Sequence, residues 1–496
     1  MGAPATRFFG SMGGNYWSTT RIVYRYEVMG TWFFTSATGF SKNHGSLPFI
    51  RIDVQDPYQL SSVGESMLNR RHRNAVVDGT GGSALDSMVQ QIWLQGVSAG
   101  EVRVVVDPLP STDWTEAETY WIVPTLARPL LLVPSGPRRA TSGSLLQYRG
   151  LRAGRINVAR NVLGWLAKAG LPPAQHTLSI QLRAGTATDS PVKLPLAHLV
   201  DSLEQNRLTA AIGIRLGVNR KPTLQLFDAE GHPAGYAKCA WNKSSTGYVE
   251  TEIAALQSIG GKPAAMRAPR LLTSGWLGGF PYLITEPLPE MVQAVRGDVK
   301  EPTAQEMFAL CPIYRTGTIS STRHFQEIGR RLEELDSTAP DHELAAEAGR
   351  VYKIVAGSKS AVPVCRRWHG DLVPWNSARE PSGQLWCWDW ESSEADAMAG
   401  LDAIHWMFSV RREQATGRVA SHLLPALRDA QSHLEAASVP RPAWPDLLAV
   451  YTLVVVERAW TLTAQFGSWK DSWISRTELM ELLQTAGKHL QVEDTA

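Results

Sequence analysis

Cysteine is scarce in this sequence. The 496 residues include only four cysteines, Cys239, Cys311, Cys365 and Cys387. Four cysteines are too few for a disulfide framework in a chain of this length, and they lack the paired short spacing that is typical of zinc ligands. We therefore expect reduced thiols in the core of a cytoplasmic protein.

A dominant charge sign and a long hydrophobic run are also missing. The formal net charge is +2, whereas a dedicated nucleic-acid-binding protein usually has a strongly basic face. The most apolar run, Leu447–Val456, ends at Glu457 and Arg458 and is too short to span a membrane. The first residues contain no apolar stretch of signal-peptide length. We expect no nucleic-acid partner and no membrane partner, and we expect the apolar run to form a buried helix.

The length of the chain predicts two or three domains, because one hydrophobic core rarely supports so many residues. The first 200 residues contain short β-like runs separated by clusters of Gly, Ser and Pro, with helices expected over Ala84–Leu94 and Arg155–Ala169. We predict a mixed α/β accessory domain of unknown role over residues 1–200. Its glycine-rich run Ala75–Gly82 and basic run Asn69–Arg73 are compatible with anion binding, but a plain turn and a solvated loop are the favoured interpretations.

One stretch, residues 367–391, is rich in groups that suit phosphoryl transfer. Asp371 and Asn376 lie on one short loop, and Asp389 follows a polar turn and an apolar run, so we expect a hairpin with oxygen-rich ends. Transfer from ATP requires a carboxylate that accepts a hydroxyl proton and oxygen ligands that hold Mg²⁺ against the phosphates. The pattern indicates Asp371 as the proton acceptor and Asn376 and Asp389 as the metal ligands.

This stretch resembles the catalytic loop of the aminoglycoside phosphotransferase and choline kinase family, which has a protein-kinase-like fold. His-Gly-Asp at 369–371 is followed by four residues and Asn376, then by a hydrophobic strand that ends in Asp389, an aromatic residue and Glu391. The resemblance covers about residues 208–496. It implies that His369 is a buried brace of the loop and that Glu391 is a supporting residue of the site.

An antiparallel meander is expected from Ala211 to Trp241, followed by a helix over Val249–Leu256. In the family that the chain resembles, a lysine at the place of Lys238 offers its charge to the nucleotide phosphates, and a helix glutamate holds it. Helical spacing favours Glu252 over Glu250 as that partner. The alternative is an edge-strand lysine that blunts aggregation and has no partner.

The segment Pro281–Leu288 resembles the hinge strand whose backbone groups pair with an adenine edge, and it places Glu286 among the expected nucleotide-binding residues. The loop 217–222 lacks the three glycines of a protein-kinase flap, which weakens the protein-kinase interpretation more than the ATP interpretation. Asp402 resembles the family aspartate that opens the next helix. A carboxylate at a helix start suits the helix dipole, and we expect a structural role for it.

Together these features predict an α+β chain with a two-lobed protein-kinase-like fold. Its N-lobe (201–288) is expected to contain an antiparallel sheet and its C-lobe (289–496) to be mainly helical, after the accessory domain (1–200). The predicted function is ATP- and Mg²⁺-dependent phosphorylation of a hydroxyl group on a small molecule of aminoglycoside, sugar, choline or amino-alcohol type. Eighteen tryptophans could wall a pocket for a cation such as choline, but core packing is their favoured use.

Two other functions stay open. One is a catalytically weak, kinase-like binding or regulatory module whose main function lies in the N-terminal domain. The other is phosphorylation of protein serine or threonine, which ranks last because no Ala-Pro-Glu motif follows Asp389. The sequence does not determine the acceptor, the choice between ATP and GTP, or the oligomeric state.

Overall fold

The chain divides into two compact units, residues 1–73 and 74–496, in the computed structural model. The residues that the structure describes are 19–28, 31–40, 51–53, 83–152, 154–184, 194–205, 207–215, 221–261, 264–295, 301–414, 417–467, 469 and 473–493. The runs Ala75–Gly82 and Asn69–Arg73 lie outside the described residues, as does most of the loop 217–222.

The first unit contains an antiparallel sheet of three strands in the order β1-β2-β3. These are β1 (Thr19–Val28), β2 (Thr31–Phe40) and β3 (Arg51–Asp53). β1 and β2 form a hairpin in which Val28 lies opposite Thr31. Both strands are rich in β-branched and aromatic residues, which favour extended backbone.

The second unit is organised on a nine-stranded antiparallel sheet in the order β12-β13-β10-β9-β8-β6-β5-β7-β4. The strands are β4 (Val102–Val106), β5 (Trp114–Thr125), β6 (Arg128–Pro134), β7 (Thr177–Arg183), β8 (Thr209–Gly213), β9 (Thr223–Phe227), β10 (Pro233–Cys239), β12 (Leu271–Leu277) and β13 (Phe280–Thr285). β6 pairs with β8, with Leu132 opposite Ile212, so backbone hydrogen bonds cross the domain boundary predicted at residue 201. The assignment of residues 1–200 to an accessory domain and of residues 201–496 to two kinase-like lobes stays a prediction.

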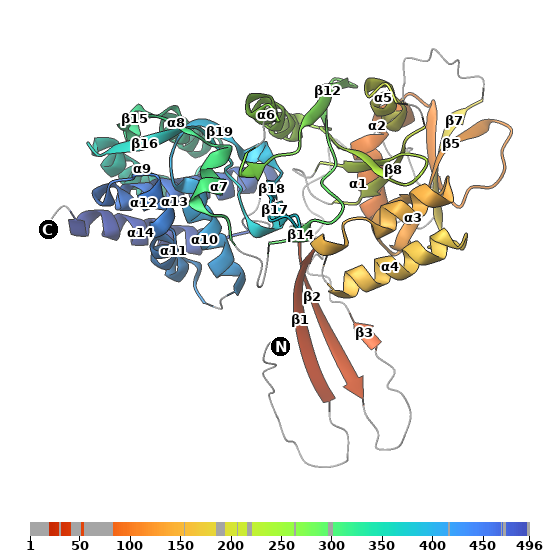
Figure 1. The fold of residues 1–496 in the computed structure, drawn as a ribbon, viewed down its shortest axis with the longest axis horizontal. Helices are drawn as coiled ribbons and strands as arrows, with labels where there is room; N and C mark the ends of the chain where they lie inside the picture. The colour runs from red at the N-terminus through yellow and green to blue at the C-terminus, as the bar shows by residue number, and fades with distance from the viewer. Residues whose placement is uncertain are drawn as a thin grey trace. The chain divides into compact units, whose positions relative to one another are not determined.

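The helices that accompany this sheet are α1 (Ser83–Ile92), α2 (Leu94–Ser98), α3 (Arg138–Leu146), α4 (Gly154–Lys168), α5 (Pro195–Ser202) and α6 (Lys243–Ile259). α3 and α4 pack side by side (Figure 1). One buried cluster includes Leu85 from α1, Ile122 from β5 and Ala237 from β10. Strands on both sides of residue 201 therefore share one core. α6 begins with a capping box between Asn242 and Ser245, which satisfies backbone N–H groups of its first turn.

Helices dominate the chain after residue 300. They are α7 (Ala304–Ala309), α8 (Arg323–Thr338), α9 (His342–Gly357), α10 (Leu401–Gln414), α11 (Leu423–Asp429), α12 (Gln431–Ala436), α13 (Trp444–Phe466) and α14 (Arg476–Glu493). Within the described residues, one helical stretch, Arg441–Gln465, is long and apolar enough to cross a membrane, but 78% of its apolar window is buried inside the protein. The predicted buried helix over 447–456 is therefore confirmed as the middle of α13.

Two small sheets lie among these helices and carry the loops of the candidate site (Figure 1). One has the order β11-β18-β17-β14 and the other β15-β16-β19. Their strands are β11 (Met266–Arg267), β14 (Gln293–Ala294), β15 (Ile313–Thr318), β16 (Ala361–Trp368), β17 (Ser377–Arg379), β18 (Leu385–Cys387) and β19 (Glu394–Met398). Ser377 of β17 lies opposite Cys387 of β18, which confirms the predicted hairpin.

Mostly antiparallel sheets and helices make this an α+β protein, while the arrangement into two kinase-like lobes stays a prediction. The four cysteines are free and buried, as expected for thiols that fill a core.

Candidate active site

Gly370 permits the sharp turn that follows β16. Its φ is +84°, and a Cβ at this position would lie 2.1 Å from the backbone oxygen of Ser392, so only glycine fits. Asp402, in the first turn of α10, accepts hydrogen bonds from the backbone N–H groups of His369 (2.8 Å) and Gly370 (2.9 Å). The carboxylate of Asp402 therefore holds the backbone of the loop, which agrees with the structural role expected for it, although these contacts were not predicted.

His369 is fully buried and supports the same loop. Its Nδ1 accepts a hydrogen bond from the backbone N–H of Asp371 (3.2 Å), which leaves Nε2–H to donate to the carbonyl of Trp388 (3.2 Å). Burial lowers the pKa of His369, so the imidazole stays neutral and this tautomer is favoured. Its ring lies 4.3 Å from that of Trp390, centroid to centroid. The prediction of a buried, hydrogen-bonding residue is confirmed.

The carboxylate of Asp371 is held at both of its oxygens. Oδ2 accepts a hydrogen bond from Nδ2 of Asn376 (2.9 Å), and Oδ1 lies 3.1 Å from Nε2 of His405. The Asp371 side chain is still 35% exposed, so a ligand in solution can reach it. His405 was not predicted from the sequence. The available signal was its spacing of three residues from Asp402, which places both on one face of α10.

The β17–β18 hairpin brings Asn376 and Asp389 to neighbouring positions. The backbone N–H of Trp388 donates to the carbonyl of Asn376 (3.1 Å), and Asp389 is the next residue. Asp389 has a φ of +72°, in the left-handed region that aspartate tolerates better than most residues. Such backbone strain persists where the surroundings enforce it, and it is frequent at functional sites.

Lys238 joins strand β10 to this hairpin. Its Nζ lies 2.7 Å from Oε2 of Glu252 and 2.6 Å from Oδ1 of Asp389. The predicted pairing with Glu252 rather than Glu250 is confirmed, and the edge-strand alternative is wrong, because β10 lies between β9 and β13. Burial alone would lower the pKa of Lys238, but the carboxylates of Asp389 and Glu252 outweigh burial and raise it above its usual range.

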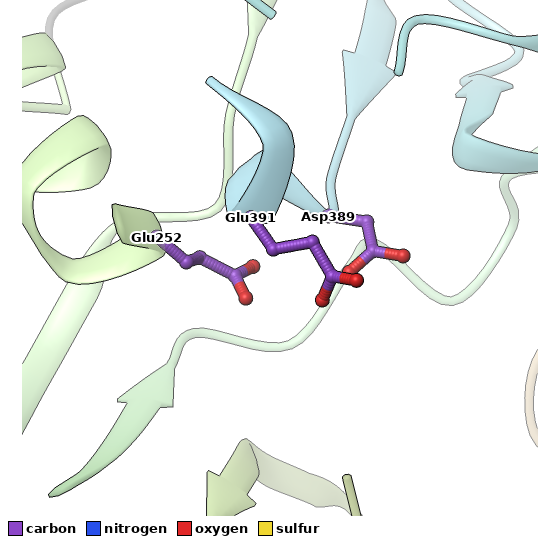
Figure 2. A group of neighbouring side chains, drawn as sticks. All are labelled: Glu252, Asp389 and Glu391. Carbon is purple, nitrogen blue, oxygen red and sulfur yellow. The ribbon is translucent and has the colours of Figure 1, made fainter. Parts of the chain in front are cut away.

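Three carboxylates meet beside Lys238. One oxygen from each of Glu252, Asp389 and Glu391 lies within 4.8 Å of the other two. Figure 2 shows Glu252 on α6 and the other two side chains on the segment after β18, close together. Burial alone would raise the pKa of Asp389, but Lys238 and Lys221 hold it well below its usual range. Burial and the neighbouring Asp389 raise the pKa of Glu391 to about 7.

Lys221 is a second cation at this site and is buried, and the sequence did not reveal it. It is 6% exposed and forms an ion pair with Glu391. Its Nζ also lies 4.7 Å from the centre of the Tyr248 ring, a distance suited to a cation–π contact. Lys221 lies in the loop before β9, where the sequence has no periodic pattern of apolar residues from which its burial could be predicted. Glu391, predicted as a supporting residue, thus lies between Lys221 and Asp389.

Glu286, which was predicted to belong to the hinge, contacts Arg270, the residue directly before β12. Its Oε1 accepts a hydrogen bond from the backbone N–H of Arg270 (3.0 Å), and its Oε2 lies 3.5 Å from the Arg270 guanidinium. The side chain of Glu286 is therefore engaged at the start of β12. The structure does not place it among the Lys238, Glu252 and Asp389 contacts described above, and its predicted nucleotide role stays untested.

Tyr148, between α3 and α4, contacts the segment predicted to be the hinge. Its hydroxyl donates to the carbonyl of Leu288 (2.9 Å), and its side chain packs in a buried cluster with Val292 and Trp386. Its ring centre lies 5.9 Å from that of Tyr236, which shares a face of β10 with Lys238 because the two are two residues apart. Since 140 residues separate Tyr148 from Leu288, no local pattern predicts this contact.

No family model matches this sequence, and no curated protein matches it. A solved structure of LicA in complex with AMP is 14% identical, covers 60% of this chain and 97% of its own, and has a TM-score of 0.36. The choline kinase LicA from Streptococcus pneumoniae is 11% identical, with 60% and 98% covered and a TM-score of 0.34. The spectinomycin phosphotransferase APH(9)-Ia, in complex with ADP and spectinomycin, is 12% identical, with 61% and 100% covered and a TM-score of 0.32.

Proposed function

We propose that this protein transfers the terminal phosphate of ATP to a hydroxyl group of a small molecule in the presence of Mg²⁺. The observation that carries the proposal is the position of Lys238 between Glu252 and Asp389. A lysine that is held by a helix glutamate and directed at a hairpin carboxylate suits the binding of nucleotide phosphates beside a metal ion. The loop with Asp371 and Asn376 precedes the same hairpin.

The donor groups beside Lys238 fit Mg²⁺. Asp389 and Glu391 offer carboxylate oxygens, which are hard ligands, and the low pKa of Asp389 keeps it ionised. Asp389 and Asn376 would hold the ion, and Glu391 is a further candidate ligand. A bound Mg²⁺ neutralises the charge that develops on the phosphate oxygens.

Two lysines with little solvent exposure would face the phosphates. The side chains of Lys238 and Lys221 are 16% and 7% exposed, so water screens their charges poorly. In this structure, carboxylates neutralise the charge of each lysine. A bound polyphosphate with its metal ion would contact the same lysines and carboxylates. A charge contact of this kind stabilises a transferring phosphate because it is already in place before the reaction.

Asp371 would accept the proton of the acceptor hydroxyl. Hydrogen bonds from Asn376 and His405 fix its carboxylate, and its partial exposure leaves room for a substrate. A general base of this kind contributes about 10²- to 10⁴-fold in rate. Aminoglycosides, sugars, choline and amino alcohols all offer such a hydroxyl.

The base of the nucleotide would lie at the hinge, where Tyr148 already donates to the carbonyl of Leu288. We expect the base to displace the Tyr148 hydroxyl when ATP binds. The same contact favours a second candidate function, a regulatory module whose nucleotide site is closed by Tyr148.

A screen for nucleotide consumption by the full chain distinguishes the two functions. It would test hydroxylated compounds of the aminoglycoside, sugar, choline and amino-alcohol classes with Mg-ATP and Mg-GTP. ADP or GDP formation that depends on one acceptor, and that is lost in Asp371→Asn, supports transfer. Nucleotide binding without turnover for every acceptor supports the regulatory module.

A further inference from the structure

His405 lies directly against the carboxylate of Asp371. Its Nε2 is 3.1 Å from Oδ1 of Asp371, and its Nδ1 is 3.1 Å from the hydroxyl of Tyr451. The His405 side chain is 12% exposed, and Tyr451 is 1% exposed. The three side chains form a hydrogen-bonded series that runs from α13 through α10 to the catalytic loop. We call it the Tyr451–His405–Asp371 series.

The hydrogen positions in this series follow from what each group can donate. Burial raises the pKa of Tyr451, so its phenol keeps its proton and can donate to Nδ1 of His405. When Nδ1 accepts, the proton of a neutral imidazole resides on Nε2. Nε2–H then donates to the Asp371 carboxylate, and Tyr451 selects the tautomer that does so.

Helix α10 holds the catalytic loop at two points. Asp402 binds two backbone N–H groups of the loop, and His405, one turn further on the same face, contacts the side chain of Asp371. Asn376 binds the other oxygen of that side chain. Rotation of the Asp371 carboxylate is therefore restricted from both sides by groups on separate elements.

We propose that His405 is a positioning residue, which fixes the Asp371 carboxylate in the orientation that the acceptor hydroxyl requires. The inference rests on the proposed function, because this orientation matters only if Asp371 accepts a proton. His405 keeps its own proton throughout, and the hydroxyl proton ends on Asp371. Tyr451 affects the Asp371 carboxylate indirectly, through its hydrogen bond to the imidazole of His405.

Substitution of His405 separates positioning from nucleotide binding. His405→Ala should lower kcat by about tenfold to a hundredfold, since a small misplacement of a reacting group costs that much. The KM for ATP and the Kd of Mg-ATP should stay at wild-type values, because His405 contacts Asp371 and not the Lys238 group. His405→Gln should restore most of kcat, because its amide N–H can replace Nε2–H. His405→Asn is too short to reach and should resemble His405→Ala.

Two further variants complete the test, one within the series and one as a control for folding. Tyr451→Phe removes one hydroxyl, and its kcat should lie between those of wild type and His405→Ala. His433 is a matched control: it is 5% exposed, and its Nε2 contacts the carbonyl of Pro302 (2.9 Å) away from Asp371. His433→Ala should lower the melting temperature and leave kcat unchanged.

Three outcomes would overturn the inference. Wild-type kcat in His405→Ala contradicts it directly, and it leaves the proposed function standing. If His405→Ala does not fold, wild-type kcat in Tyr451→Phe and His405→Asn contradicts it in the same way. If the wild-type protein binds Mg-ATP but phosphorylates no acceptor, the proposed function fails, and this inference fails with it.

Discussion

Lys238 and Asp389 are in direct contact, with 2.6 Å between Nζ and Oδ1, although 151 residues separate them in the sequence. The contact connects the nine-stranded sheet to the segment that follows the β17–β18 hairpin. Glu252 completes the group from α6. Lys238 contacts two carboxylates from distant segments. A phosphate group that binds to Lys238 would therefore change the contacts of both segments.

Lys238→Ala should damage both activity and stability. We expect kcat/KM for ATP to fall by well over about tenfold, because a preorganised charge contact to phosphate is lost where water screens it poorly. The variant also leaves the Glu252 side chain, which is only 4% exposed, without its cation. Loss of one partner from a buried ion pair costs about 3–5 kcal/mol. Steady-state kinetics and urea denaturation measure the two effects.

The double variant Lys238→Met/Glu252→Gln is the control for stability. It removes both charges, so its free energy of unfolding should exceed that of Lys238→Ala while it stays inactive. Normal kinetics in Lys238→Ala would contradict the placement of nucleotide beside β10.

Asp389→Ala should weaken the Mg²⁺-dependent binding of nucleotide, because the ion loses the carboxylate proposed to hold it and keeps only the neutral oxygen of Asn376 and the candidate ligand Glu391. Calorimetry with ATP, with and without Mg²⁺, measures the effect. Asp396→Ala is the matched control, since Asp396 also has a positive φ (56°) but pairs with Arg315 at 2.7 Å. Equal Mg-ATP affinity in wild type and Asp389→Ala would refute the metal assignment.

Tyr148→Ala should strengthen nucleotide binding. It frees the carbonyl of Leu288 and opens the buried space that the Tyr148 ring fills. Tyr148→Phe keeps the ring and removes only the hydroxyl, so its affinity should lie between those of wild type and Tyr148→Ala. Fluorescence titration with a labelled nucleotide gives the Kd. Weaker binding in Tyr148→Ala would mean that the ring lines the base site and does not block it.

Stability should fall on acidification because of His324. This residue is 1% exposed, and burial lowers its pKa from 6.5 to about 4. Between these two values the unfolded chain binds a proton that the folded chain does not, so the free energy of unfolding decreases as pH falls from 6.5 toward 4. At about 1.4 kcal/mol per pKa unit the decrease is about 3 kcal/mol.

Urea denaturation across this pH range tests the prediction, with His324→Gln as the non-titrating control. The pH dependence of the variant should be flatter than that of wild type by about one proton. Parallel curves would show that His324 is not the group responsible.

The β17–β18 hairpin could be predicted because its information is local. Asp371, Asn376 and Asp389 lie on one loop and one hairpin, so their spacing alone brings them near one another. The same holds for Lys238 and Glu252, which are 14 residues apart on a strand and the helix that follows it. The roles of His369 and Asp402 followed from the resemblance, and their hydrogen bonds agree with it.

The rest depends on contacts between distant segments, which no local periodicity encodes. Lys221 meets Glu391 across 170 residues, and Tyr148 meets Leu288 across 140. The boundary predicted at residue 201 rested on a change in pattern, whereas β6 and β8 pair across it. A chain shortened to begin near residue 201 would expose the edge of β8, so activity is best measured on the full chain.

The Asp371→Asn variant tests the proposed ATP-dependent phosphate transfer most directly. Phosphate transfer from labelled ATP to an acceptor found in the screen would be followed for wild type and for this variant, with Mg-ATP affinity measured on the same samples. We predict that the rate falls by about 10²- to 10⁴-fold while the affinity is unchanged, because Asp371 handles a proton and is not a phosphate contact. Transfer by Asp371→Asn at the wild-type rate would contradict the assignment of this loop as the catalytic centre.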